Sequence, residues 1–124
     1  MIIGVGTDLC DISRIYEILL RFPYRLAERI LTKEELKEYP KNINHQAAFL
    51  AKRFAAKEAT AKALGVGIGL ISWTDIEIKH NKNGAPCLNL KNMAKKIAND
   101  KGVNDQYISL SDESRYALAF VVLS

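Results

Sequence analysis

The feature that most constrains the fold is a run of helix-forming residues in the middle of the chain, residues 53–63, rich in alanine, lysine and glutamate. No glycine or proline interrupts this run. Asn44 or a neighbouring residue is expected to begin the helix. Gly65 is expected to end it, because glycine readily adopts the left-handed conformation found at helix C-termini. The sequence therefore predicts one long helix around which the other elements are arranged.

One face of this helix carries an unusually placed carboxylate, Glu58. At about 100° per residue, several side chains fall within about 60° of it: Ala47, Ala51, Phe54, Ala55, Ala61 and Lys62. A carboxylate among small and aromatic side chains is expected to be partly buried, and a buried charge needs a charged partner or a metal. The alternative is an ordinary surface pair of Glu58 with Lys62, one turn apart, which stabilises a helix by roughly 0.2–0.5 kcal/mol.

Composition limits the class of protein. The chain has 124 residues, of which 48% are hydrophobic and 26% charged, so we expect one folded domain, residues 1–124, with a single core. The net charge is +4, and the basic excess lies in residues 1–62, with eleven Lys and Arg against eight Asp and Glu. This distribution favours an anionic partner, but it lacks the dense basic patch of a nucleic-acid-binding protein.

Neither membrane insertion nor export is expected. No stretch approaches the roughly 20 apolar residues that span a bilayer, and the first residues lack the pattern of a signal peptide. Cys10 and Cys87 do not have the spacing of a metal site, and we expect both to be reduced and packed in the core. The sequence is therefore typical of a soluble, cytoplasmic protein.

The segment before the long helix is predicted to hold a strand and short helices. Residues 2–9 are typical of a buried strand, in which Gly4 and Gly6 indicate close approach by another backbone or a ligand. Three helices should follow, each with a recognisable boundary. They are a helix capped by Asp11 and running through Arg21, a turn or two at residues 24–31, and a short helix opened by the capping box of Thr32 and Glu35.

The segment after the long helix is predicted to be mainly strands. Two strands, including residues 76–79 and 86–90, turn at Asn83 and Gly84, and a short helix follows at 93–99. A closing hairpin joins residues 107–111 to 116–123. Because the last strand is apolar on both faces, it is expected to be central. The predicted class is α+β, with an antiparallel sheet packed with the long central helix.

Three groups suggest chemistry on a phosphate substrate. Asp8 at the end of the first strand and Glu58 on the long helix are oxygen ligands from separate elements, which suits Mg²⁺. Lys62, on the same face as Glu58, offers a point charge for phosphate oxygens. The glycines of residues 65–69 expose backbone amides that can hold an anion or lie against a nucleotide ring. The alternatives remain open: Asp8 as a cap or turn residue, and the glycines as a helix C-cap and loop without any phosphate-binding fingerprint.

Taken in order along the chain, these groups resemble the holo-acyl-carrier-protein synthase family of 4′-phosphopantetheinyl transferases over nearly the whole length. The central segments that carry the resemblance are Ile3-Gly-Val-Gly-Thr-Asp8, Glu28-Arg-Ile-Leu-Thr32, Phe49-Leu-Ala-Lys-Arg-Phe-Ala-Ala-Lys-Glu58 and Lys62-Ala-Leu-Gly65. The resemblance extends through Gly67-Ile-Gly69, Asp75-Ile-Glu-Ile78, Asn83-Gly-Ala-Pro86, Ser109-Leu-Ser111 and Tyr116-Ala117. It implies the phosphopantetheinyl transferase fold.

The resemblance also implies a reaction: Mg²⁺-dependent transfer of the phosphopantetheine arm of coenzyme A to a serine of apo-acyl carrier protein, releasing adenosine 3′,5′-bisphosphate. It assigns Asp8 and Glu58 to the metal and Lys62 to the diphosphate, which makes these three the expected catalytic residues. Glu58 is also the candidate base for the serine proton, directly or through a metal-bound water, although a pure ligand role stays open. The implied setting is fatty acid biosynthesis.

Further contacts follow from the resemblance. Contacts to coenzyme A are expected at Arg53, Lys62, Gly65, Gly67, Pro86 and Ser111, and contacts to the acidic carrier protein at Arg14, Arg21 and Arg25. The alternative for each arginine is a solvated helix face. Arg53 points about 140° away from Glu58 on the helix, so both cannot serve one pocket of one subunit. Family members of this short type are trimers with sites between subunits, which resolves that conflict.

One position departs from the family pattern. Asp112 stands where the family usually has a histidine after Ser-x-Ser, and an aspartate repels phosphate unless it binds metal or turns away. Of the two histidines, His45 is the suggested substitute, because it lies near the start of the long helix. The leading alternative function is a metal-dependent phosphohydrolase of coenzyme A or a nucleotide, which uses the same carboxylates and lysine. An inactive scaffold and a nucleic-acid-binding protein fit less well.

Overall fold

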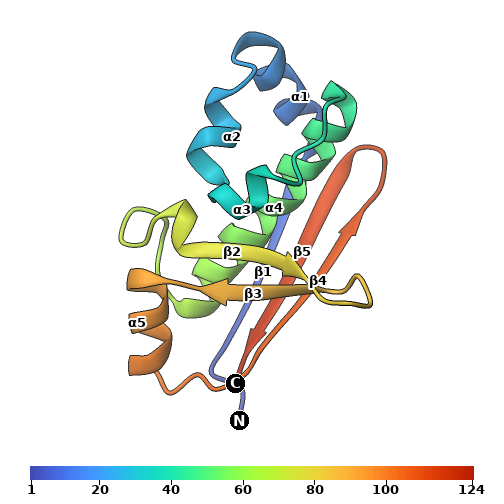
Figure 1. The fold of residues 1–124 in the computed structure, drawn as a ribbon. Coiled ribbons are helices and arrows are strands. Elements are labelled where there is room, and N and C mark those ends of the chain that lie inside the picture. The colour runs from blue at the N-terminus through green and yellow to red at the C-terminus, as the bar shows by residue number, and fades with distance from the viewer.

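The computed structural model describes all residues from 1 to 124. Its central element is the long helix α4 (Ile43–Leu64), which packs against an antiparallel three-stranded sheet (Figure 1). The other elements, in chain order, are β1 (Gly4–Asp11), α1 (Ile12–Arg21), α2 (Arg25–Ile30), α3 (Lys33–Leu36), η1 (Trp73–Asp75), β2 (Ile76–His80), β3 (Pro86–Leu90), α5 (Asn92–Asp100), β4 (Gln106–Asp112) and β5 (Tyr116–Leu123). The predicted α+β class, with a long helix on an antiparallel sheet, is confirmed.

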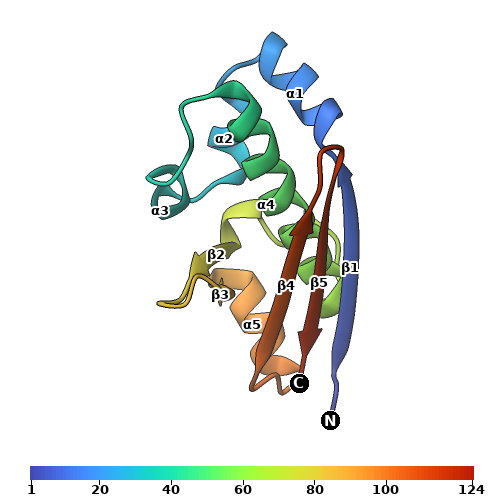
Figure 2. The same cartoon turned by 90° about the vertical axis from the view of Figure 1, so that its right-hand side faces the viewer.

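The main sheet has the order β1-β5-β4, and all its neighbours run antiparallel. The last strand, β5, is therefore central, as its apolar sequence predicts. Helix α4 covers one face of the sheet and leaves the opposite face uncovered by any other element (Figure 2). Val5 and Leu9 of β1 are 51% and 60% exposed there, and Leu118 and Phe120 of β5 are 43% and 42% exposed. The prediction of a buried first strand is wrong, because β1 is an edge strand with only one covered face.

The two glycines of β1 explain how closely the sheet and α4 pack. A Cβ atom at Gly4 would collide with the carbonyl oxygen of Ala63, and one at Gly6 with that of Ala59. Both carbonyls belong to α4, so the predicted close approach of another backbone is confirmed. Any side chain at Gly4 or Gly6 would push the sheet away from the helix face that carries Glu58 and Lys62.

The helix boundaries follow the predicted capping residues. Asp11 caps α1 by accepting a hydrogen bond from the amide of Ser13 at 2.9 Å. Thr32 and Glu35 form the expected capping box of α3. Gly65 ends α4 in the left-handed conformation, with φ of 76°. Local hydrogen-bonding chemistry thus determines where these helices begin and end.

The second sheet pairs β2 with β3 through the turn at Asn83 and Gly84, and α5 lies beside it (Figure 1). The cysteines behave differently from each other: Cys10 is buried and Cys87 is exposed, and neither forms a disulfide. The prediction of a core position is therefore correct for Cys10 and wrong for Cys87, which lies on an outer strand. None of the helices is long and apolar enough to cross a membrane.

Candidate active site

The first part of the site lies where β1 crosses α4. Lys62, on the last turn of the helix, reaches the strand: its Nζ lies 3.2 Å from Asp8 Oδ1 and donates a hydrogen bond to the carbonyl oxygen of Thr7 at 2.9 Å. The Asp8 side chain is 16% exposed, and its second oxygen, Oδ2, is buried without a hydrogen-bond partner. Asp8 lies within β1 rather than at its end, since the strand continues to Asp11.

Glu58 completes the arrangement from the preceding turn of α4. The residue is half-buried, as its alanine-rich face predicts, and it makes no hydrogen bond or ion pair within the chain. Burial raises the pKa of its carboxyl group, and the negative charge of Asp8 raises it further, while Lys62 acts in the opposite direction. The charges of two carboxylates and one ammonium group, from two elements, therefore act on one another.

The donor set fits a hard divalent cation. Asp8 Oδ2 is an unpartnered carboxylate oxygen, and Glu58 offers two more oxygens beside it. No group of three or more protein ligands assembles anywhere in the molecule. Mg²⁺ typically binds proteins through one or two carboxylates and fills its other positions with water and phosphate oxygens, so a two-carboxylate site suits it. Lys62 extends the same site toward an anion.

A groove beside Asp8 continues the site along α1. It has a volume of about 230 Å³ and includes Arg14 on its rim. Its floor is apolar and consists of Leu9, Ile15, Ile18, Leu26 and Phe54. Farther along, the guanidinium groups of Arg21 and Arg25 lie 5.8 and 4.6 Å from the ring of Phe22. Basic side chains and apolar surface thus follow one another from Asp8 to the end of α1.

Arg53 lies in a different place, on the opposite side of α4. Its side chain is only 3% exposed, with Nε 2.9 Å from Glu35 Oε2 and Nη2 3.0 Å from Glu38 Oε2. It lines a pocket of about 260 Å³ together with Lys52, Pro86 and other residues, and none of Asp8, Glu58 and Lys62 contributes to that pocket. Arg53 and Glu58 are therefore separated within one chain. This separation agrees with the helical projection, which places them on different sides of α4.

The pocket of Arg53 also holds the position that departs from the family pattern. Asp112 lies there, with its Oδ1 3.6 Å from Lys52 Nζ. His80, at the end of β2, lines the same pocket. His45, the suggested substitute for the missing histidine, is on the exposed first turn of α4 and does not line this pocket, so its role stays a prediction.

The remaining predicted contacts are dispersed. Gly65 and Gly67 are exposed just beyond Lys62, at the C-terminal end of α4. Ser111 lines a shallow hollow on the open face of the sheet with Leu9, Tyr116 and Leu118. The predicted contact residues therefore lie in separate places: Asp8, Glu58, Lys62 and the glycines toward the C-terminal end of α4, and Arg53 with Pro86 in the pocket of Asp112.

A buried ion cluster escaped the sequence analysis. We use this name for Glu35, Arg53, Lys57 and Glu77, all 2% exposed or less. Lys57 Nζ lies 2.7 Å from Glu35 Oε1, and Glu77 accepts hydrogen bonds from Thr32 Oγ1 at 2.6 Å and Lys91 Nζ at 3.0 Å. The available signal was the pair Arg53 and Lys57, which are one turn apart on the helix face that points away from Glu58.

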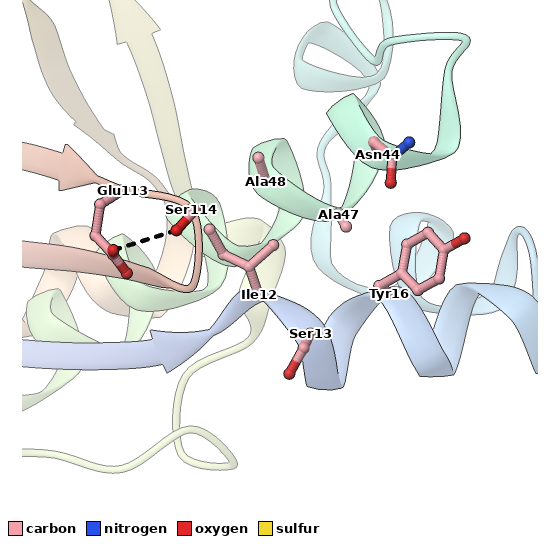
Figure 3. Close-up of a pocket in the computed structure, with 8 residues that line it drawn as sticks. All are labelled: Ile12, Ser13, Tyr16, Asn44, Ala47, Ala48, Glu113 and Ser114. Atoms are coloured by element: carbon pink, nitrogen blue, oxygen red, sulfur yellow. Dashed lines mark hydrogen bonds between the residues drawn. The ribbon is translucent and has the colours of Figure 1, made fainter.

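The largest cavity has no part in this chemistry. It has a volume of about 340 Å³ and lies between the first turns of α1 and α4 and the β4–β5 turn, where Glu113 and Ser114 face Ala47 and Ala48 (Figure 3). Its one carboxylate, Glu113, has a lowered pKa because it accepts hydrogen bonds from the amides of Arg115 and Tyr116. With a single satisfied carboxylate and largely apolar walls, this cavity offers neither a base nor a metal site.

Comparisons with known proteins point to one family. The profile of the 4′-phosphopantetheinyl transferase superfamily matches residues 4–121. A holo-[acyl-carrier-protein] synthase of Alkalilimnicola ehrlichii is 46% identical over 124 residues, covering 99% of this chain and 97% of the relative. A crystal structure of the holo-[acyl-carrier-protein] synthase of Neisseria meningitidis has a TM-score of 0.90 at 42% identity, covering 100% of this chain and 99% of that one. The Helicobacter pylori synthase, solved in complex with coenzyme A, has a TM-score of 0.83 at 32% identity, covering 97% and 99%.

Proposed function

Because the chain belongs to the holo-[acyl-carrier-protein] synthases of the 4′-phosphopantetheinyl transferase superfamily, we propose that it modifies an acyl carrier protein. It transfers the 4′-phosphopantetheine group of coenzyme A to a serine hydroxyl of the apo-carrier protein and releases adenosine 3′,5′-bisphosphate. The coenzyme A complex of the Helicobacter pylori relative supports coenzyme A as the donor. We further propose that the reaction depends on Mg²⁺ and serves fatty acid biosynthesis in the cytoplasm.

The observation that carries this proposal is the convergence of Asp8, Glu58 and Lys62. Attack at the β-phosphorus of coenzyme A increases negative charge on the phosphate oxygens and on the leaving group. A site for this reaction needs oxygen ligands for a cation, a positive group for the diphosphate and a base for the serine. The unpartnered Oδ2 of Asp8, the ammonium of Lys62 and the raised pKa of Glu58 supply one property each.

Asp8 and Glu58 are the residues that would hold the divalent cation. When bound, the cation supplies Lewis-acid neutralisation of the diphosphate. Lys62 adds a positive charge on the same side, and its flexible, half-exposed side chain can follow the phosphate oxygens. Asp8 fixes the position of the site, because its strand is held against α4 by the contacts at Gly4 and Gly6.

Glu58 is proposed to accept the serine proton, directly or through a water molecule. A general base is most effective when its pKa approaches the working pH. Burial and the charge of Asp8 move the pKa of Glu58 in that direction. Its carboxylate has no partner inside the chain that would occupy its oxygens. Its oxygens are therefore free to accept a proton from the serine hydroxyl of the carrier protein.

Coenzyme A is proposed to bind between subunits of a homotrimer. One subunit would supply Lys62, Gly65 and Gly67, and its neighbour would supply Arg53, Pro86 and Ser111. The open apolar face of the main sheet, which includes Val5, Leu9, Leu118 and Phe120, supports self-association, since exposed apolar patches of this kind mark interaction surfaces. Light scattering on the purified protein tests this, and a monomer at the assay concentration would contradict it.

The carrier protein is proposed to dock on α1 and the residues after it. Arg14 lies on the rim of the groove beside Asp8, and Arg21 and Arg25 follow on the same side of the chain. An acidic partner steered by these charges would bring its serine to Glu58. Raising the salt concentration should therefore lower the apparent association rate, because exposed charges are screened.

The test is to incubate the protein with coenzyme A, Mg²⁺ and apo-acyl carrier protein and to measure the mass of the carrier protein. The proposal predicts the added phosphopantetheine group and equal release of adenosine 3′,5′-bisphosphate. A parallel reaction without carrier protein distinguishes the transferase from the alternative function, a metal-dependent phosphohydrolase. Consumption of coenzyme A there, together with an unmodified carrier protein in the full reaction, would replace the transferase with a phosphohydrolase.

A further inference from the structure

Lys62 occupies the carboxylate that a cation would use. Its ammonium lies 3.2 Å from Asp8 Oδ1, and this leaves only the buried Oδ2 of Asp8 unpartnered. Its second contact, 2.9 Å to the carbonyl oxygen of Thr7, holds it over β1. In the chain on its own, the group expected to bind phosphate is therefore turned toward the metal site.

The geometry also indicates that this contact breaks easily. The side chain of Lys62 is 54% exposed, and ion pairs with so much solvent around one partner contribute little to stability. The flexible four-carbon side chain of Lys62 can change its rotamer and leave Asp8 without any change in the backbone. By contrast, Asp8 is held in a strand and cannot follow it.

Charge balance determines when Lys62 leaves. Asp8, Glu58 and Lys62 together carry one net negative charge. A divalent cation bound at the carboxylates reverses that sign and places two positive groups beside each other. A diphosphate restores the balance, because it offers Lys62 a new partner and shares its oxygens with the cation.

We propose that Lys62 and the divalent cation compete for Asp8, and that the diphosphate of the coenzyme resolves this competition by drawing Lys62 away. Lys62 thus adds to the coupling between metal and coenzyme that the shared phosphate oxygens provide. The inference rests on the proposed function for the identity of the diphosphate ligand. It predicts that each ligand strengthens the binding of the other, by the same factor in both directions.

The experiment measures Mn²⁺ binding at pH 8 by electron paramagnetic resonance of the free ion, with and without coenzyme A and without carrier protein. Mn²⁺ is a suitable probe because it prefers the same oxygen ligands as Mg²⁺. A titration without protein corrects for Mn²⁺ bound by coenzyme A in solution. For the wild-type protein, coenzyme A should tighten Mn²⁺ binding by about 5- to 100-fold, the usual range of coupling between sites.

Replacing the lysine should weaken this coupling, because only the part carried by phosphate oxygens on the cation remains. In Lys62→Met, Mn²⁺ alone should bind about 3- to 10-fold more tightly than to the wild type, and the tightening by coenzyme A should be smaller than in the wild type by a similar factor. Lys62→Gln, which retains a donor for Thr7 but no charge, should behave in the same way. Lys96→Met is the matched control, since Lys96 pairs with Asp100 at 2.9 Å on an exposed face of α5. It should bind Mn²⁺ like the wild type.

Mn²⁺ affinity that is unchanged in both Lys62 variants would overturn the exchange, and so would wild-type coupling in either of them. The outcome is distinct from a failure of the proposed function. If the carrier protein gains its phosphopantetheine while both variants bind Mn²⁺ like the wild type, the transferase stands and the exchange is wrong. If the carrier protein gains no mass, the transferase is wrong, whatever the coupling.

Discussion

Helix α4 carries two charged clusters, one on each of two opposite faces, and each contains both acidic and basic side chains. They differ in how many of their charges find a partner within the chain. In the buried ion cluster, Glu35 accepts from the amide of Thr32, pairs with Lys57 and Arg53, and receives the amide of Ile78 at 3.4 Å. At the candidate active site, Asp8 Oδ2 has no partner and Glu58 has none within the chain. The charges of the first cluster are paired within the fold, and the second leaves ligand positions for something outside it.

The difference shows what each cluster costs the fold and what it can do. Buried charges need partners, and the buried ion cluster provides them, although Arg53 Nε, 2.9 Å from Glu35 Oε2, is not aligned for a hydrogen bond. Its members therefore connect α3, α4 and β2 firmly, and Arg53 also lines the pocket with Lys52 and Pro86. The active-site cluster keeps two carboxylates close together, which is unfavourable until a cation arrives. Such repulsion is typical of functional sites.

The largest expected effect on stability comes from removing the charge of Glu35, the central carboxylate of the buried ion cluster. Glu35→Gln keeps the shape of the side chain but leaves Lys57 buried without a carboxylate and Arg53 with only that of Glu38, so we expect a loss of about 3–5 kcal/mol in the free energy of unfolding. Urea denaturation at one fixed protein concentration measures it. Glu34→Gln is the matched control, because Glu34 is exposed on the same helix and pairs only with Lys37. Equal stability of the two variants would show that the buried pairing contributes nothing.

The next effect is a loss of stability at low pH. Burial alone would raise the pKa of Glu77, but hydrogen bonds from Thr32, Lys91 and Asn89 outweigh it and lower the pKa from 4.5 to about 2. A carboxyl group with a lowered folded pKa stabilises the fold above its unfolded pKa. That contribution, about 3 kcal/mol, is lost as the pH falls from 4.5 to 2. Glu77→Gln should flatten the stability profile in this window, and an unchanged slope would contradict the assignment.

The smallest effect has the opposite sign. Because the pKa of Glu58 is raised, its ionisation destabilises the fold as the pH rises above the unfolded value of 4.5. Glu58→Gln should therefore stabilise the protein slightly at neutral pH, by less than the Glu77 contribution, because solvent screens this half-exposed group. The gain should disappear below pH 4.5. A variant that is less stable at neutral pH would mean that Glu58 holds the fold together.

The two clusters also differ in how far the sequence predicts them. Caps and close approaches were predicted correctly, because Asp11, Thr32, Gly65 and the glycines of β1 act within a few residues or through one backbone contact. The prediction that Glu58 lies half-buried on the alanine-rich face of α4 was also correct, because helical spacing alone determines which side chains share a face. These parts of the fold depend on local chemistry.

Apart from Asp8 with Lys62, which the family resemblance brings together, side-chain contacts between distant segments were not predicted. Glu35 was identified only as a capping residue, yet its main partner, Lys57, is 22 residues away. Nothing in the local pattern of Cys87 indicates that β3 leaves it exposed, and periodicity cannot show that only one face of the main sheet is covered. Such facts depend on which elements meet, and that is decided by the packing of the whole chain.

The most direct measurement of the central claim compares the rate of phosphopantetheine transfer to apo-acyl carrier protein by the wild type and by Glu58→Gln. Both are saturated with coenzyme A and Mg²⁺, and the mass of the carrier protein is followed with time. We predict that the wild type modifies it completely and that kcat of the folded variant falls by about 100-fold or more, the contribution of a positioned base. An unmodified carrier protein with the wild type, or equal rates for the two proteins, would contradict the assignment of this face of α4 as the active site.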